Sequence, residues 1–135
     1  MTDFKVIPVI DILNSEIVHA IKGERDKYKS LETDLTKSSN PLDLMSAIQK
    51  TYSLNEFYIA DLDSIIKNKP NIKLINQILQ NEDLNLMLDP GIKSLDDLEL
   101  LVSTIKIDQL IFGIETIKSL DIISRAIERI GRDKL

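Results

Sequence analysis

The chain has 135 residues, which is enough for one domain or for part of a larger one. Its formal net charge of −5 argues against a nucleic-acid-binding protein, because such proteins normally present a basic surface. It has no cysteine and one histidine, which excludes disulfides, thiolate nucleophiles, thiolate-bound metals and a multi-histidine metal site within one chain.

Membrane and export signals are not found in the sequence. The start, Met1-Thr-Asp-Phe-Lys-Val6, lacks the basic residues and the long apolar stretch of a signal peptide. No apolar run approaches the ~20 residues that cross a bilayer. We therefore expect a cytoplasmic protein that contacts neither a membrane nor a nucleic acid.

The first third of the chain predicts a strand, a hairpin arm and a loop. The strand is predicted from Lys5 to Ile12, and the extended run from Ile17 to Ile21 is expected to pair over its end. Residues 22–37 are polar without a helical period, and a loop of this length is usually functional or disordered. A helix then begins at Asn40 and Pro41, which suit a cap and a first helical position.

The rest of the chain alternates strands and helices in the same manner. Short apolar runs predict strands buried on both faces, and apolar stripes of helical spacing predict the helices between them. The predicted strands are Glu56–Asp61, Leu84–Leu88 and Gln109–Phe112; the predicted helices are about Asn71–Gln80, one capped by Ser94 with Asp97, and one from Ser119 that Gly131 ends.

Four consecutive strand–helix units predict an α/β fold with a parallel sheet and right-handed crossovers. Such units form either a small open sheet or half of an eight-stranded barrel. The sequence stops at Leu135, where a fifth strand is expected, so we predict a (β/α)4 half of a TIM (β/α)8 barrel forming one domain over residues 1–135. Its unpaired edge strands invite pairing with another chain.

Three predicted strands end in an aspartate, namely Asp11, Asp61 and Asp89. Because the carboxyl ends of parallel strands meet at one edge, we expect these side chains to share one polar site. Asp11 is then either a catalytic acid or base or a loop cap. Asp61 and Asp63 either orient substrate hydroxyls or cap the next helix, and Asp89 before a proline is foremost a turn former.

Four segments together resemble the histidine-biosynthesis (β/α)8 barrels, which include phosphoribosylformimino-aminoimidazole carboxamide ribotide isomerase and the cyclase subunit of imidazole glycerol phosphate synthase. The resemblance covers nearly all of the chain but only the first half of such a barrel, and it is closest to a divergent subgroup related to the isomerase. The segments are Val6–Gly23, Tyr58–Asp63, Leu88–Ser94 and Phe112–Thr116.

The resemblance implies an Amadori-type aldose–ketose isomerisation of a phosphorylated sugar or ribotide. This chemistry needs a general acid and a general base, and two carboxylates supply both without a metal or cofactor. Asp11 matches the first catalytic aspartate, whereas the second belongs to a fifth strand beyond this sequence. The resemblance places His19, Lys22, Asp61 and Asp63 at the substrate, and Gly91, Gly113 and Ile114 at a phosphate.

An incomplete site implies a homodimer or a missing C-terminal half, and this chain is then either part of an active barrel or an inactive half. The alternative is a non-catalytic half-barrel that binds a phosphorylated metabolite or a protein. Asp89-Pro90-Gly91 replaces the glycine-rich loop of the family, and His19 stands where it usually has arginine. The segment Lys22–Lys29 is either a lid that brings cations to a phosphate or a solvated loop, and His19 is otherwise a surface residue.

Overall fold

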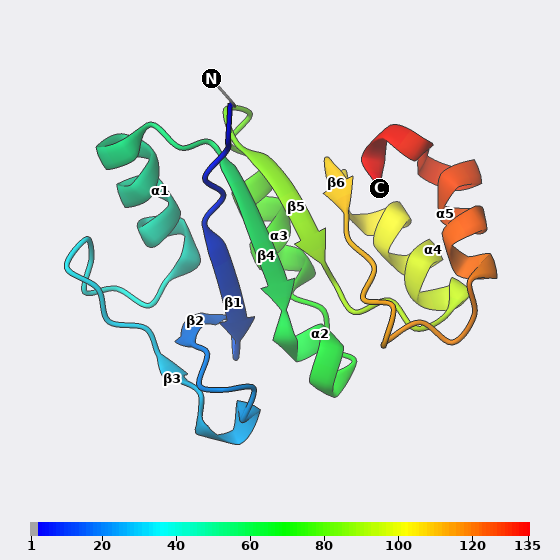
Figure 1. Ribbon diagram of the computed structural model, residues 1–135, viewed down its shortest axis with the longest axis horizontal. Coiled ribbons are helices and arrows are strands. Elements are labelled where there is room, and N and C mark those ends of the chain that lie inside the picture. Colours follow the sequence, from blue (N-terminus) through cyan, green and yellow to red (C-terminus); the bar gives the residue numbers. More distant parts are fainter. Residues whose placement is uncertain (1–2) are drawn as a thin grey trace.

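The computed structural model describes residues 3–135, which form an α/β fold around one sheet (Figure 1). The six-stranded sheet has the order β3-β2-β1-β4-β5-β6, and its strands β1, β4, β5 and β6 are parallel. The strands are β1 Val9–Leu13, β2 Glu16–His19, β3 Lys29–Ser30, β4 Glu56–Asp61, β5 Asn85–Asp89 and β6 Gln109–Leu110. The predicted parallel α/β architecture is therefore confirmed for these four strands.

Two antiparallel strands extend the sheet beyond β1. The hairpin arm β2 pairs with the end of β1, so that Asp11 lies opposite Val18. Strand β3 pairs with β2 and follows a short 3-10 helix, η1 Arg25–Lys27. The predicted hairpin arm is confirmed, whereas the description of residues 22–37 as one loop is corrected, because the return of the chain along β2 orders part of it.

Three of the described α-helices begin where a capping side chain accepts from one of their first N–H groups. Asn40 accepts from the N–H of Leu42 and Pro41 occupies the first position, as predicted; Ser94 and Asp97 form the predicted capping box. The helices are α1 Pro41–Tyr52, α2 Leu62–Lys67, α3 Ile72–Leu79, α4 Leu95–Thr104 and α5 Asp121–Ile130, followed by the 3-10 helix η2 Arg132–Lys134. None of the helices within residues 3–135 is long and apolar enough to cross a membrane.

The two faces of the parallel sheet differ. Helices α1, α3, α4 and α5 lie on one side of it, and no helix of residues 3–135 covers the other side of the central strands (Figure 1). Burial alternates accordingly, since Ile10, Ile59 and Leu88 are buried on the helix side while Val9 is 68% exposed on the other. We call the uncovered side the open face.

Several element boundaries differ from the sequence prediction. The second predicted strand, Glu56–Asp61, matches β4 residue for residue. The first begins only at Val9, where its pairing with β4 begins, and the fourth shortens to Gln109–Leu110 at the far edge of the sheet. The six-residue helix α2 was not predicted; the carboxylate of Asp61 caps it by accepting from the N–H of Ser64.

Candidate functional site

Two of the three strand-end aspartates lie on the open face. Asp11 is paired across the sheet with Ala60, and Ala60 is paired with Asp89. Residues paired across parallel strands point to the same side of the sheet, so the two carboxylates flank β4 from the same direction. They are two strands apart, which is roughly 10 Å. The structure therefore places these two strand-end carboxylates on the same face of the sheet.

Asp61 lies on the opposite side. It is paired with Ile12, one position beyond Asp11, and is fully buried among the helices. Successive residues of a strand alternate between the two faces, so a displacement of one residue in register reverses the side chain. The expectation that all three aspartates share one site is therefore wrong for Asp61.

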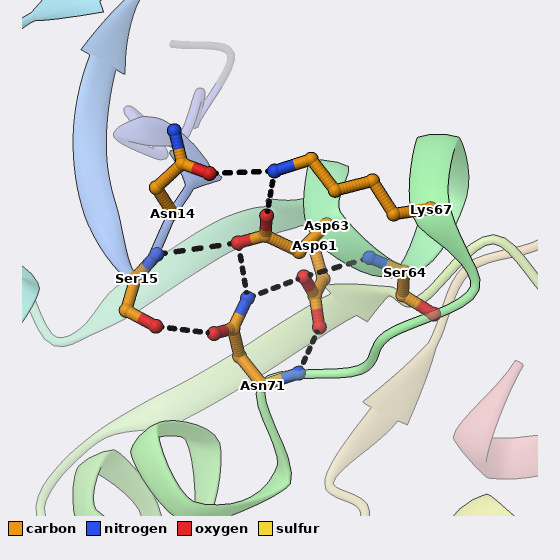
Figure 2. Close-up of polar contacts among 7 residues, drawn as sticks. All are labelled: Asn14, Ser15, Asp61, Asp63, Ser64, Lys67 and Asn71. Carbon is orange, nitrogen blue, oxygen red and sulfur yellow. Dashed lines mark hydrogen bonds and ion pairs between the residues drawn. The ribbon is translucent and has the colours of Figure 1, made fainter.

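Asp61 and Asp63 belong to a hydrogen-bonded cluster that we call the aspartate network (Figure 2). At its centre, Asn71 Nδ2 donates to Asp61 Oδ1 at 2.7 Å and to Asp63 Oδ2 at 2.9 Å. The N–H groups of Ser15 and Asn71 donate to Asp63 and Asp61, at 3.2 and 2.8 Å. The members are Asn14, Ser15, Asp61, Asp63, Ser64, Lys67 and Asn71.

The aspartate network joins the turn after β1 to α2 and to the start of α3. Lys67 Nζ bridges Asn14 Oδ1 and Asp63 Oδ1, at 2.5 and 2.9 Å, and Ser15 Oγ donates to Asn71 Oδ1 at 2.7 Å. Asp61 caps α2, as one of the two alternatives for it predicts. Asp63 does not cap a helix; it lies in the first turn of α2 and accepts hydrogen bonds from Ser15, Lys67 and Asn71. Sequence reasoning identified Asn71 only as the start of a helix, since a contact to residues 14 and 15 has no local signal.

Tyr58 was missed from the sequence and lies on the open face. Its hydroxyl donates to Asp89 Oδ2 at 3.2 Å. Burial, the carboxylate of Asp89 and the charges of Asp11 and Glu115 raise the pKa of Tyr58 to about 12, so the hydroxyl stays protonated at neutral pH. Strand alternation was the available signal, because Tyr58 precedes Ala60 by two positions and therefore shares its face.

Asp11 is half-buried at the carboxyl end of β1. Partial burial raises the pKa of Asp11, and the positive charge of Arg25 partly opposes the shift. Arg25 belongs to η1, so the segment Lys22–Lys29 returns toward Asp11. Tyr28 of that segment packs against the small cluster of Val18, Ala60 and Leu62. Lys22 itself is exposed, with a left-handed φ of 50°.

His19 is exposed at the end of β2. It lines a groove of about 410 Å³ together with Asp11, beside the edge of β1 that β2 does not pair. Helix α1 contributes Leu44 and Ile48 to the same groove. The structure thus brings His19 and Asp11 to one concavity, although they come from different strands.

The two predicted phosphate-binding glycines differ in their surroundings. The N–H of Gly91 donates to Asp89 Oδ1 at 3.0 Å, and a Cβ on Gly91 would lie 2.5 Å from the side chain of Ile65. Gly113 and Ile114 lie in the turn after β6, where Thr116 closes the turn onto the Gly113 carbonyl at 2.9 Å. Within residues 3–135, the N–H groups of Gly113 and Ile114 have no hydrogen-bond acceptor.

The residues on the open face provide one carboxylic acid with a raised pKa, one tyrosine donor and a second carboxylate. A raised pKa brings a carboxyl group closer to the range in which it gives and takes protons near neutrality. The second carboxylate and the tyrosine can hold hydroxyl groups in place. This set suits proton transfer on a hydroxylated molecule.

Comparison with known proteins places these features in context. A family model described as histidine biosynthesis protein matches residues 5–135. An uncharacterized protein of Methanocaldococcus jannaschii is 38% identical over 120 residues, which are 88% of this chain and 51% of that protein. Phosphoribosyl imidazole-4-carboxamide isomerases are more distant: that of Lactococcus lactis is 24% identical and that of Lacticaseibacillus casei 28%, each over 97% of this chain and 52% of the isomerase.

The chain thus spans about half the length of the curated relatives it matches. The names of the two isomerases give a substrate with two 5-phosphoribosyl groups.

Proposed function

Because the chain belongs to the histidine biosynthesis protein family, we propose that it supplies the N-terminal half-barrel of a ribotide isomerase-like protein of the cytoplasm. The observation that carries the proposal is Asp11 at the carboxyl end of β1, on the open face, with burial raising its pKa. This is where barrels of parallel strands place catalytic groups.

The proposed reaction is an Amadori-type isomerisation of an aminoaldose phosphate. Protonated Asp11 gives its proton to the ring oxygen, the bond from that oxygen to C1 breaks, and the amine nitrogen forms a double bond to C1. A base then removes the proton on C2 to give an enaminol. The base returns that proton to C1 while the C2 hydroxyl gives its proton to the Asp11 carboxylate, which leaves the ketone at C2 and restores protonated Asp11. No atom is gained or lost, and the base is a carboxylate from the second half of the barrel.

A phosphate of the substrate is proposed to bind at the turn after β6. The N–H groups of Gly113 and Ile114 are free within the described residues, and oriented backbone N–H groups are common anion ligands. His19 and Lys22 are proposed to face the substrate from the β2–β3 side. The buried Asp61 and Asp63 support this edge of the sheet through the aspartate network.

The second half of the barrel is proposed to cover the open face. Val9 on this face is 68% exposed, and Gln109 Oε1 on the edge strand β6 is buried without a hydrogen-bond partner among the described residues. We propose that a second copy of this half-barrel occupies the position when the 135-residue domain is alone.

The test of the proposed reaction is the substitution Asp11→Asn, which keeps the shape and removes the titrating group. Turnover of a phosphoribosylamino aldose is expected to fall about 10²–10⁴-fold, while its binding measured by calorimetry changes little. Asp83→Asn, at an exposed position near the amino end of β5, is the matched control. Binding without turnover in the unmodified domain, also after mixing with a C-terminal half-barrel, would instead support the non-catalytic binding function.

A further inference from the structure

The loop between β5 and α4 stands where parallel α/β proteins usually bind anions, at a helix N-terminus beyond the carboxyl end of a strand. In this chain three N–H groups of that loop, those of Gly91, Lys93 and Ser94, already donate to its own carboxylates. Asp89 Oδ1 accepts from the N–H of Gly91 at 3.0 Å. Asp97 Oδ2 accepts from the N–H groups of Lys93 and Ser94, at 3.0 and 2.9 Å.

Backbone conformation and packing explain why this loop contains a glycine, without a ligand. Gly91 has a φ of +64°, and a Cβ there would lie 2.8 Å from the Cα of Ile65 in α2. Only glycine fits both the left-handed backbone and this close approach. Gly91 therefore allows helix packing, and its N–H points to Asp89 rather than to solvent.

The charge at this position also opposes an anion. Asp89 Oδ2 holds the hydroxyl of Tyr58 at 3.2 Å, so both oxygens of Asp89 are engaged on the open face. The charges of Asp11 and Glu115 also act on that hydroxyl, which places three acids around it. A phosphate dianion there would face their negative charge in a half-buried setting and would have to displace Asp89 from Gly91.

We infer that Asp89 is a specificity-determining residue that excludes phosphate from the β5–α4 loop, so that the substrate presents hydroxyl groups rather than a phosphate to this part of the open face. The inference rests on the proposed function and narrows its substrate to a sugar phosphate that carries no phosphate at the β5 end. The remaining lone pairs of a carboxylate accept hydrogen bonds from such hydroxyl groups. This differs from a substrate with two phosphoribosyl groups, as the relatives' names describe.

The experiment follows backbone amide resonances by NMR while the labelled domain is titrated with inorganic phosphate and then with ribose 5-phosphate. In the unmodified domain the Gly91 amide is expected to stay in place. In Asp89→Ala the Gly91 amide no longer donates to Asp89, so its resonance is expected to shift as phosphate is added. The affinity for phosphate read from that resonance is expected to be at least 10-fold higher than in the unmodified domain. Asp89→Asn keeps an acceptor for Gly91 but removes the charge, so it is expected to give a smaller gain. Asp83→Ala, near the other end of β5, removes an exposed charge as the matched control.

The outcomes separate this inference from the proposed function. A shift of Gly91 in the unmodified domain, or no gain in either Asp89 variant, overturns the exclusion by Asp89. The Gly113 and Ile114 amides report on the proposed phosphate site, and their failure to shift contradicts that site alone. A gain of phosphate affinity at Gly91 that is confined to the Asp89 variants supports the inference, whether or not the Gly113 amide resonance shifts.

Discussion

Asp61 and Asp63 lie two residues apart and have pKa values displaced in opposite directions. Burial raises the pKa of Asp61 in spite of the hydrogen bonds that it accepts from Asn71 and Ser64. Burial opposes the charge of Asp63 as well, but hydrogen bonds from Asn71, Lys67 and two backbone N–H groups outweigh it and hold its pKa at about 2. The deeper burial of Asp61 and the charged donor Lys67 at Asp63 together account for the opposite directions.

The low pKa of Asp63 predicts a pH-dependent contribution to stability. A carboxyl group whose pKa is lowered by folding stabilises the folded state above its unfolded pKa, and this contribution is lost as the pH falls toward the folded pKa of about 2. Asp63→Asn is expected to reduce the free energy of unfolding by about 2 kcal/mol at pH 6, and roughly half of that difference is expected to be gone at pH 3. Denaturant unfolding of the unmodified domain and of Asp63→Asn at pH 6 and pH 3 measures this difference in unfolding free energy. A difference that grows on acidification would contradict the low pKa of Asp63.

At the scale of the elements, the aspartate network is the joint between β1, α2 and α3. The turn at Asn14 and Ser15 has left-handed backbone at both residues, with φ of 55° and 63°. Its contacts to Asp63, Lys67 and Asn71 hold that turn against helices that are about 50 residues later in the sequence. The hairpin arm β2 leaves from this turn, so the network also sets where the segment near Asp11 begins.

Loss of the central amide is expected to loosen this joint. Asn71→Ala removes the donor to both buried carboxylates and the acceptor of Ser15 Oγ, which is expected to destabilise the domain by about 2–4 kcal/mol. Asn76→Ala is the matched control, because Asn76 makes one exposed hydrogen bond to the Thr104 carbonyl and is expected to cost under about 1 kcal/mol. Thermal and denaturant unfolding compare the two variants. Equal losses of stability would show that the aspartate network contributes no more than a single exposed hydrogen bond.

At the scale of the whole molecule, one layer of helices covers one side of the sheet and leaves the other side open (Figure 1). The parallel part of the sheet has two edge strands. One is β1, which β2 pairs only over Asp11–Leu13, and the other is the two-residue β6. Unpaired edges and an exposed apolar position such as Val9 favour association. This is the physical basis for the proposed second half-barrel.

Self-association of the isolated domain gives a direct test. Light scattering over a concentration series is expected to show a dimer, and Val9→Lys is expected to weaken it at least 10-fold by placing a charge on the open face. Leu120→Lys is the matched control, since Leu120 is also 68% exposed but lies directly before α5 and not on a strand of the sheet. A monomer at all concentrations, or equal weakening by both variants, would refute the pairing.

Much of this arrangement was predictable from local sequence. The apolar runs gave β4 with both of its ends, and Asn40-Pro41 and Ser94 with Asp97 gave the starts of α1 and α4, because capping needs only residues within one helical turn. The segments around Asp11, Tyr58 and Gly113 gave the family, which the family match over residues 5–135 confirms.

Tertiary structure decided the composition of the site. The apolar run in the sequence shows that Asp61 ends β4, but only the register of β4 against β1 places it opposite Ile12, on the side away from Asp11. Likewise, the hydroxyl of Tyr58 has a partner only because Asp89 lies on the neighbouring strand. Gly91 must be a glycine in part because Ile65 of α2 packs closely against it. The sequence by itself determined the elements, their order and the family, because these depend on short-range patterns; which carboxylates face each other depends on contacts between residues far apart in the chain, and only the folded sheet specifies those.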